Sequence, residues 1–224
     1  MQEHNPHTYT LNAEAETNAL CEGFVRVIEQ HIATHPRKEA LLTELQQQQA
    51  HLEATHQDWI VDMPAKYNLK MVVLVLAAYR VLQKELPREE TLKLIREAFI
   101  KPTEGFVRQF TRQMLDEAAD PFQAIINTSK TREQDAFGKG FSFERAQDDK
   151  QAYLLNVKRC FYHRFFVANG TPELTRIFCD YDATWIGAID PKRHGIRFER
   201  PSTLGYGATM CPFHFYRTGE NDRA

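Results

Sequence analysis

The chain has 224 residues, of which 42% are hydrophobic and 26% charged, and its mean hydropathy is -0.52. These values are typical of a globular protein that can bury one sizeable core. The formal net charge of -2 at pH 7 argues against a nucleic-acid-binding surface, which needs a strong excess of basic residues.

The sequence pattern indicates neither a membrane span nor a signal peptide. The longest apolar run covers residues 71–79, far short of the roughly 20 residues that cross a bilayer. Residues 1–10 are polar and lack the basic-then-apolar order of a signal peptide. We therefore expect a cytoplasmic protein that acts on a small molecule, with neither nucleic acid nor membrane among its partners.

The first part of the chain, residues 1–135, shows one amphipathic helical pattern after another. Proline positions suggest where these helices begin and end. The expected helices cover approximately residues 20–32, 36–52, 65–84, 87–99 and 104–119, with a shorter helical piece to about residue 130. Asp120 and Pro121 are expected to stop the fifth of them. These helices are also the candidate contact region for a homo-oligomer.

The second part, residues 136–224, alternates β-branched and aromatic residues with polar ones. Expected strands lie near residues 141–145, 153–157, 185–189, 196–200 and 210–216, and expected helices at 160–169 and after Thr171. Residues 191–195 are expected to form a hairpin connection. The predicted fold class is therefore α+β: a helical N-terminal part followed by a small antiparallel sheet carrying one or two helices.

Four cysteines in a chain of this length do not indicate a disulfide framework. Cys21 stands alone in the helical part, beside apolar neighbours, and is expected to be a small buried residue. Cys160, Cys179 and Cys211 all lie in the last third of the chain. Packing, metal binding or chemical reactivity could each explain that grouping.

An ordered series of short motifs runs through this last third. The motifs are Cys160-Phe-Tyr-His163, Asn169-Gly-Thr-Pro-Glu-Leu174, Phe178-Cys-Asp-Tyr-Asp182, Phe198-Glu-Arg-Pro-Ser-Thr-Leu204, Gly207 and Cys211-Pro-Phe-His-Phe215. The series resembles the signature of the L-2-amino-thiazoline-4-carboxylic acid hydrolase family. Three positions depart from that signature: Pro212 replaces its Asp, His214 its Arg, and Pro201 its usual Thr. If the missing Asp and Arg contact substrate, the substrate here differs from the one that names the family.

The resemblance implies hydrolytic opening of a 2-amino-thiazoline ring to N-carbamoyl-L-cysteine. Such a reaction needs a nucleophile or base for the amidine carbon and an acid for the leaving group. It also needs a carboxylate to hold the cationic amidine and a cation for the substrate's own carboxylate.

Three cysteines and one aspartate are the candidate catalytic residues. Cys160 lies at an expected helix start, where the free N–H groups, together with Arg159 and His163, favour a thiolate. Cys179 and Asp182 are three residues apart and share one helix face, so they could act as nucleophile and amidine anchor. The alternative is a buried thiol in each case, and a turn-capping role for Asp182.

The third cysteine lies on an expected strand. Cys211 shares a strand face with Phe213 and Phe215, which also suits a core position, whereas His214 points to the opposite face. If Cys211 is functional, it lies just after the turn at residues 205–207.

The candidate substrate-binding residues are Arg200, His163, Trp185 and His214. Arg200 is the expected partner of the substrate carboxylate, with Arg197 as a competitor, and either could instead form a cross-strand ion pair. Trp185 could form an aromatic wall, although a large aromatic residue on a strand is also typical of the core.

Two other classes of function stay open at this level. A metal such as zinc accepts three Cys and one His, but the sequence has no Cys-x-x-Cys pair. The main expectation is an enzyme that uses no cofactor. The alternative is a non-catalytic module that binds a small molecule or metal, similar to 4-vinyl reductase-type domains. A third possibility makes the first half a dimerisation element and the cysteines part of the core.

Overall fold

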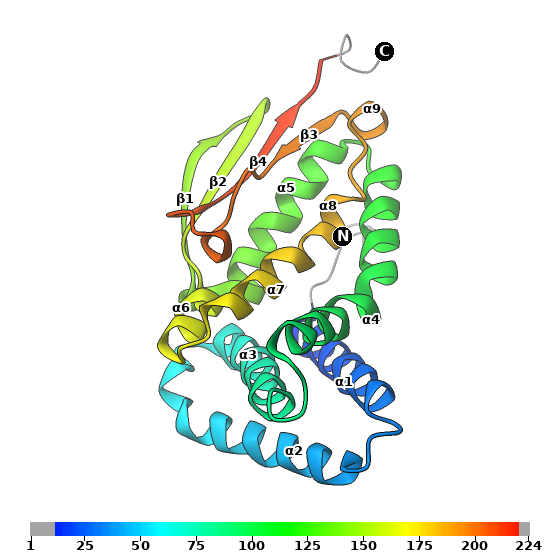
Figure 1. The fold of residues 1–224 in the computed structure, drawn as a ribbon. Coiled ribbons are helices and arrows are strands. Elements are labelled where there is room, and N and C mark those ends of the chain that lie inside the picture. Colours follow the sequence, from blue (N-terminus) through cyan, green and yellow to red (C-terminus); the bar gives the residue numbers. More distant parts are fainter. Residues whose placement is uncertain (1–11, 220–224) are drawn as a thin grey trace, which may run out of the picture.

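The computed structural model describes residues 12–219 and arranges them as a helical part beside a small sheet (Figure 1). The helical part contains α1 (Ala13–His31), α2 (Lys38–Thr55), η1 (Gln57–Trp59), α3 (Met63–Leu82), α4 (Arg88–Glu117), α5 (Pro121–Arg132), the π-helix η2 (Glu133–Phe137) and η3 (Gly138–Gly140). The second part contains β1 (Ser142–Asp148), β2 (Ala152–Arg159), α6 (Phe161–Ala168), η4 (Pro172–Leu174), α7 (Thr175–Tyr181), α8 (Ala183–Ile186), α9 (Pro191–His194), β3 (Ile196–Glu199), η5 (Leu204–Tyr206) and β4 (Cys211–Arg217). The α+β prediction is confirmed. No helix within residues 12–219 is long and apolar enough to cross a membrane.

The four strands form one antiparallel sheet in the order β1-β2-β4-β3. Alternation along β4 turns Cys211, Phe213 and Phe215 toward the helices, as predicted, and leaves Pro212 and His214 on the outer face. The helix α5 lies against the inner face, where it shares a core cluster with β2, β3 and β4 (Figure 1). One face of the sheet is therefore covered and carries the candidate cysteine.

Side-chain caps explain where several helices begin. The Asp62 side chain accepts a hydrogen bond from the Ala65 N–H (2.9 Å) at the start of α3, and Asp120 does the same for Gln123 (3.2 Å) at the start of α5. Both helices also have a proline in the first turn, where the missing N–H costs nothing. These local signals are the ones that the sequence pattern displays most clearly.

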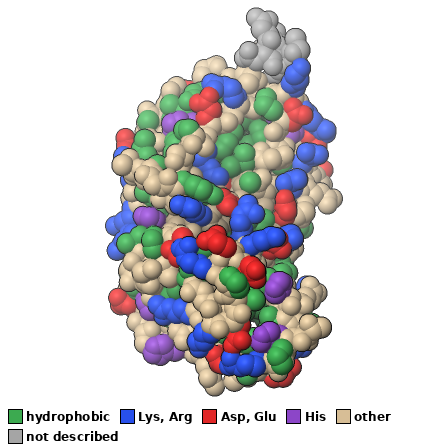
Figure 2. Space-filling model, in the orientation of Figure 1, with side chains coloured by type: hydrophobic (Ala, Val, Ile, Leu, Met, Phe, Trp, Pro, Cys, Tyr) green, Lys and Arg blue, Asp and Glu red, His purple; other side chains and the backbone are tan. Residues whose placement is uncertain are grey.

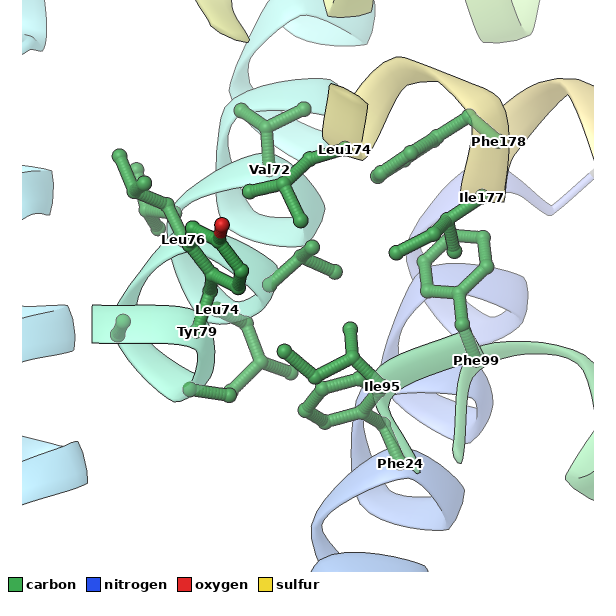
Figure 3. Close-up of a cluster of buried hydrophobic side chains, with 14 of the residues drawn as sticks. Phe24, Val72, Leu74, Leu76, Tyr79, Ile95, Phe99, Leu174, Ile177 and Phe178 are labelled. Carbon is green, nitrogen blue, oxygen red and sulfur yellow. The ribbon is translucent and has the colours of Figure 1, made fainter. Parts of the chain in front are cut away.

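The main core surrounds α3, whose side chains are buried on almost every face. Figure 3 shows side chains of α1, α3 and α4 meeting Leu174, Ile177 and Phe178 from the segment that carries Cys179. Each fully buried Leu, Ile or Phe contributes about 1.5–3 kcal/mol relative to an exposed side chain. The helical part therefore supports the segment that presents the candidate site.

The prediction of two separate helices at residues 87–99 and 104–119 is wrong. One continuous helix, α4, runs through Pro102, and its two halves point in different directions in Figure 1. The Pro102 ring packs against Gly23 of α1, where any side chain would come within 2.5 Å of the proline Cβ. The bend is thus stabilised by a close contact between helices that no local pattern reveals.

Two further assignments from sequence are also wrong. The expected strand at residues 185–189 is absent: residues 185 and 186 end the short helix α8 and residues 187–189 follow it as a turn and loop. The helix α8 comes directly after α7, and Ile186 N–H donates to Asp182 C=O (3.0 Å). The expected hairpin at residues 191–195 is a helical turn, α9, capped by Asp190 and ended by Gly195 in left-handed geometry. The apolar residues at 185–189 fit either a strand or a helix, whereas Asp190, Pro191 and Gly195 are local signals of a helical turn.

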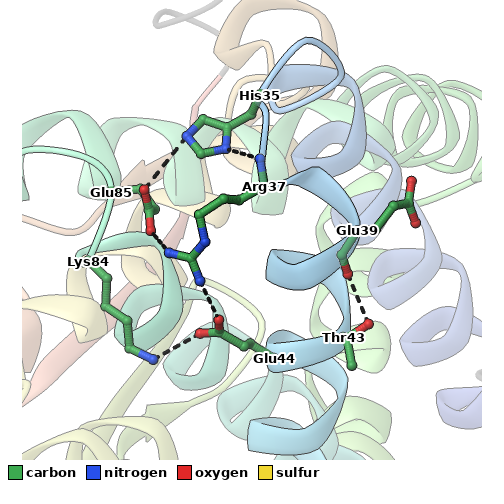
Figure 4. A network of polar contacts seen from close by, with 7 residues as sticks. All are labelled: His35, Arg37, Glu39, Thr43, Glu44, Lys84 and Glu85. Atoms are coloured by element: carbon green, nitrogen blue, oxygen red, sulfur yellow. Dashed lines mark hydrogen bonds and ion pairs between the residues drawn. The ribbon is translucent and has the colours of Figure 1, made fainter.

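Charged residues are intermixed on the surface. Figure 2 shows Lys and Arg side chains beside Asp and Glu side chains across the middle of the visible face. One such network joins the start of α2 to the end of α3, where Arg37 pairs with both Glu44 (2.7 Å) and Glu85, and Lys84 also reaches Glu44 (2.9 Å; Figure 4). Its members are partly exposed, so it fixes the geometry of the two helices more than it adds stability.

Candidate active site around Asp182

The structure brings the three cysteines of the last third together. Cys160 is the N-cap residue of α6, Cys179 lies in α7 and Cys211 begins β4. Cys179 and Cys211 both contact the turn at residues 204–206, and both act electrostatically on Cys160, so the three thiols lie in one region. Cys21 lies apart from them in α1 and is buried, as predicted.

Burial favours the thiol form of all three cysteines over the thiolate. Burial raises the pKa of Cys160 and Cys179, and it raises the pKa of Cys211 to about 11. At Cys160 the backbone N–H groups of Tyr162 and His163 lower the pKa, but burial is the larger effect. The expectation that a helix start would make Cys160 a thiolate therefore fails.

The two neighbours that were expected to activate Cys160 do not do so. The Arg159 guanidinium donates instead to the carbonyl oxygens of Lys139 (3.0 Å) and Phe141 (3.4 Å). Burial lowers the pKa of His163, which favours its neutral form, and its Nδ1 lies 3.4 Å from the Thr175 hydroxyl. His163 is thus between α6 and α7, near the thiols, without adding positive charge at neutral pH.

Asp182 is the one carboxylate fixed beside these thiols among the predicted site residues. Its Oδ2 accepts from Arg200 Nη1 (2.7 Å) and its Oδ1 from Trp185 Nε1 (3.1 Å). Burial raises the pKa of Asp182, and the Arg200 charge works in the opposite direction. Its charge also acts on the thiols of Cys179 and Cys211, so carboxylate and thiols share one site.

Arg200 has a different position from the one expected for a substrate-binding cation. Besides Asp182, its guanidinium donates to the Cys179 carbonyl oxygen (2.9 Å) and lies over the Phe213 ring at 5.3 Å. Its side chain is only 13% exposed. These contacts make it a positioning residue for Asp182. Its competitor Arg197 is half exposed, lies over the Tyr216 ring at 4.3 Å and pairs with Glu199.

Trp185 supports the carboxylate from the other side. Its indole stacks on Phe213 and Phe215 and meets Phe198 edge-on, while its N–H reaches Asp182. Trp185 is therefore packed among the aromatic residues of the core and also holds Asp182, whereas its role as an aromatic wall for a substrate stays a prediction.

His214 lies on the outer face of the sheet, away from the thiols. Its Nε2 is 3.0 Å from Asn156 Oδ1, on the neighbouring strand. Pro212 occupies the same outer face. Both departures from the family signature at this strand are therefore separated from Asp182 by the sheet, and the geometry gives no reason why they should change the substrate.

The turn at η5 covers two of the thiols. The Leu204 N–H donates to Cys211 Sγ (3.1 Å), and a Cβ at Gly205 would lie 2.9 Å from Cys179 Sγ. Two hydrogen bonds attach this turn to α7: the Tyr206 hydroxyl donates to Asp180 (2.6 Å), and the Arg176 side chain donates to the Gly205 carbonyl (3.2 Å). The glycine after the Thr-Leu motif is therefore required by close backbone approach.

Several residues of this region were missed in the sequence. The Tyr162 hydroxyl donates to Asn68 Oδ1 (2.8 Å), whose amide donates in turn to the Ala136 carbonyl (3.0 Å). The Tyr181 hydroxyl lies 3.1 Å from that of Thr103. One signal was available: Asn68 is the one amide side chain in α3 and stands beside its apolar run, and a buried amide needs partners.

Metal binding has no geometric support in the part of the chain that the structure describes. Within residues 12–219 no group of three or more His, Cys, Asp or Glu residues is placed to hold a metal ion. The thiols share their surroundings with Arg200 and apolar rings, and His214 lies on the opposite face of the sheet from Cys211, as predicted.

The molecule is thus an α+β protein in which three thiols and the carboxylate of Asp182 lie in one region between the sheet and the helices. A family model described as L-2-amino-thiazoline-4-carboxylic acid hydrolase matches residues 66–215, which is well over half of the chain. The chain belongs to this family, as its motifs predicted, and the family carries the name of a hydrolase. The match begins in α3 and so includes helices that the motifs did not cover. No curated protein and no solved structure matches the chain.

Proposed function

We propose that the protein hydrolyses a cyclic amidine of the 2-amino-thiazoline type at the site around Asp182. The observation that supports this most is the fixed carboxylate, which Arg200 and Trp185 hold beside the thiols of Cys179 and Cys211. A carboxylate is well suited to pair with a cationic amidine through charge-assisted hydrogen bonds. Family membership supplies the reaction class.

The proposed reaction consumes one water for each ring opened. The water oxygen bonds to the amidine carbon, and one hydrogen goes to the ring nitrogen. The carbon–sulfur bond then breaks with its electron pair on sulfur, which takes the second hydrogen. The oxygen becomes the carbonyl of a carbamoyl group. Asp182 anchors the amidinium and accepts the proton of the attacking group.

A covalent route uses two displacements at the same carbon. The Cys160 sulfur bonds to the amidine carbon as the ring carbon–sulfur bond breaks, and the ring sulfur takes the thiol proton. Water then replaces the Cys160 sulfur and restores the thiol. A cationic amidinium in a buried site lowers the pKa of an adjacent thiol, so the thiolate forms only when substrate is bound.

Cys160 is the preferred nucleophile of the three cysteines. Its residue is partly exposed although its thiol is buried, whereas Cys179 and Cys211 lie beneath η5. It is also the one at a helix N-terminus, where backbone N–H groups favour the thiolate. The other two thiols and Arg200 then form the wall behind the reacting carbon.

The test is turnover of 2-amino-thiazoline-4-carboxylate, with N-carbamoyl-cysteine detected by mass spectrometry. We expect product from the wild type, a loss of about 100-fold or more in Cys160→Ser, and unchanged turnover in the control Cys21→Ala. Normal turnover in Cys160→Ser would exclude the covalent route. No product from this or related cyclic amidines with the wild type would refute the function.

A further inference from the structure

A cavity of about 160 Å³ lies where α4 faces α7 and α8, and none of the predicted site residues is among those that line it. Asp180 of α7 and Ala183 and Thr184 of α8 form one side of the cavity, and Asp182 lies between them in sequence. The volume is about five times the roughly 30 Å³ that one water molecule occupies in the liquid. It is also below the roughly 300–1,000 Å³ of pockets for drug-sized ligands. The cavity therefore suits a molecule of only a few heavy atoms.

One side chain of the cavity wall has a buried hydroxyl without a partner. Thr184 is 1% exposed, and its Oγ1 has no hydrogen-bond partner within residues 12–219. Buried hydroxyl groups are nearly always hydrogen-bonded, because folding has removed the water that would otherwise bind them. A polar molecule held in this cavity would supply the missing partner.

Both signs of charge line the cavity, which has two cationic side chains and three carboxylates. The Arg96 Nε donates to Asp180 (2.7 Å), and its Nη groups have no partner in the part of the chain that the structure describes. Glu104 accepts from Arg108 through Oε1 (2.9 Å), which leaves Oε2 without a partner among the described residues. The wall therefore keeps donors and acceptors that a charged ligand can use.

We propose that this cavity is a second ligand site, which binds a small zwitterion: an amino acid with a short side chain. The ligand's ammonium group pairs with Glu104, and its carboxylate accepts from Arg96 and from the Thr184 hydroxyl. Its side chain contacts Ile100 and Ala183, which supply the apolar part of the wall. An anion alone would face three carboxylates and a cation alone would face two positive side chains, so a ligand with both charges fits better.

An NMR titration with L-alanine tests the proposal, and propionate and ethylamine are the matched probes that each keep only one of its charges. We expect saturable shifts of the amide signals of α7 and α8 with L-alanine. Either probe with a single charge should bind about 10-fold more weakly or worse. L-phenylalanine should not shift these signals, because its ring needs more space than the cavity has.

Two variants test whether L-alanine binds in this cavity. Thr184→Val keeps the shape and removes the hydroxyl, so L-alanine should bind about 3- to 10-fold more weakly. Ala183→Leu fills the cavity from an exposed position on α8, so binding should be lost. Thr218→Val is the matched control, because it removes another buried hydroxyl that has no partner among the described residues. It should bind L-alanine as the wild type does.

Three results would overturn the proposal. The first is a wild type that shows no saturable shifts with L-alanine, and the second is a wild type that binds propionate or ethylamine as tightly. The third is wild-type affinity for L-alanine in Thr184→Val or in a folded Ala183→Leu. These outcomes do not depend on turnover, so a failure of the proposed hydrolysis leaves this site standing.

Discussion

At the scale of single residues, the candidate site depends on side chains that fix the Asp182 carboxylate in place through hydrogen bonds. Arg200 and Trp185 bind both oxygens of Asp182, and Arg200 also donates to the Cys179 carbonyl oxygen. The same arrangement appears outside the site, where Tyr153 and Arg145 hold the buried Glu133. Buried carboxylates of this kind need every partner, because an unsatisfied one carries a large desolvation cost.

The pH dependence of turnover tests the role of Arg200. Because burial raises the pKa of Asp182 above its ordinary 3.8, this carboxylate becomes neutral at a higher pH than an exposed one. We expect kcat/KM to fall as the pH decreases through this raised pKa. In Arg200→Gln the lowering effect of the cation is lost, so the acid limb should move to higher pH. An unmoved acid limb would show that Arg200 does not control Asp182.

Removing the Tyr153 hydroxyl tests how much its hydrogen bond to the buried Glu133 carboxylate contributes to stability. The Tyr153 hydroxyl donates to Glu133 Oε1 (2.5 Å), and Glu133 is almost fully buried. Tyr153→Phe should therefore lower the free energy of unfolding by about 1–3 kcal/mol in urea denaturation. The control Tyr216→Phe, on the half-buried outer face of the sheet, should cost much less. Similar losses in the two variants would contradict this account of Glu133.

At the scale of elements, the turn η5 closes the site through a single close approach. A Cβ at Gly205 would meet Cys179 Sγ at 2.9 Å and the Arg176 nitrogen at 3.2 Å. Gly205→Ala should destabilise the protein by about 1–3 kcal/mol in thermal or urea unfolding. Gly105→Ala, in α4 with nothing within 4 Å, should instead stabilise it by about 0.5–1 kcal/mol. If Gly205→Ala left the stability of the protein unchanged, η5 would have to lie farther from the thiols.

Most elements were predictable because their signals are local. Asp62 and Asp120 cap helices ahead of a proline, and Gly170 ends α6 with φ +70°. The wrong assignment at Pro102 is caused by a contact distant in sequence, whereas the missed turn α9 has local signals in Asp190, Pro191 and Gly195. Pro102 remains inside a helix because its ring packs on Gly23, and no periodicity contains that information.

The site was predictable in its residue types and less so in their roles. Strand alternation correctly separated Cys211 from His214, and helical spacing correctly placed Asp182 near Cys179. The sequence could not show that Arg200 would be occupied by Asp182, since that contact joins residues 18 apart through packing. It also could not show the extent of burial, which keeps Cys160 a thiol.

At the scale of the whole molecule, the helical part and the sheet part share one hydrophobic core. The cluster around α3 includes Phe24 and Ile95 from the first part and Phe161 and Phe178 from the second. Trp59 of η1 also packs edge-on against Phe161. Shared burial of this kind couples the two parts, so we expect them to unfold together.

A single-tryptophan variant tests this coupling. The described residues contain Trp59 in the helical part and Trp185 beside the sheet, so Trp59→Phe leaves only the second as a fluorescent reporter. Its fluorescence transition in urea should coincide with the transition in far-UV circular dichroism, which reports mainly on helix. Two separated midpoints would show that the two parts unfold independently.

The most direct test of the central claim is the turnover of Asp182→Asn with 2-amino-thiazoline-4-carboxylate. The substitution removes the charge and nearly preserves the shape, and circular dichroism checks that the variant is folded. The matched control is Asp190→Asn, which keeps a residue able to cap α9. The account predicts that kcat/KM falls about 100-fold or more in Asp182→Asn and stays at the wild-type value in Asp190→Asn. A folded Asp182→Asn protein with wild-type turnover would contradict it.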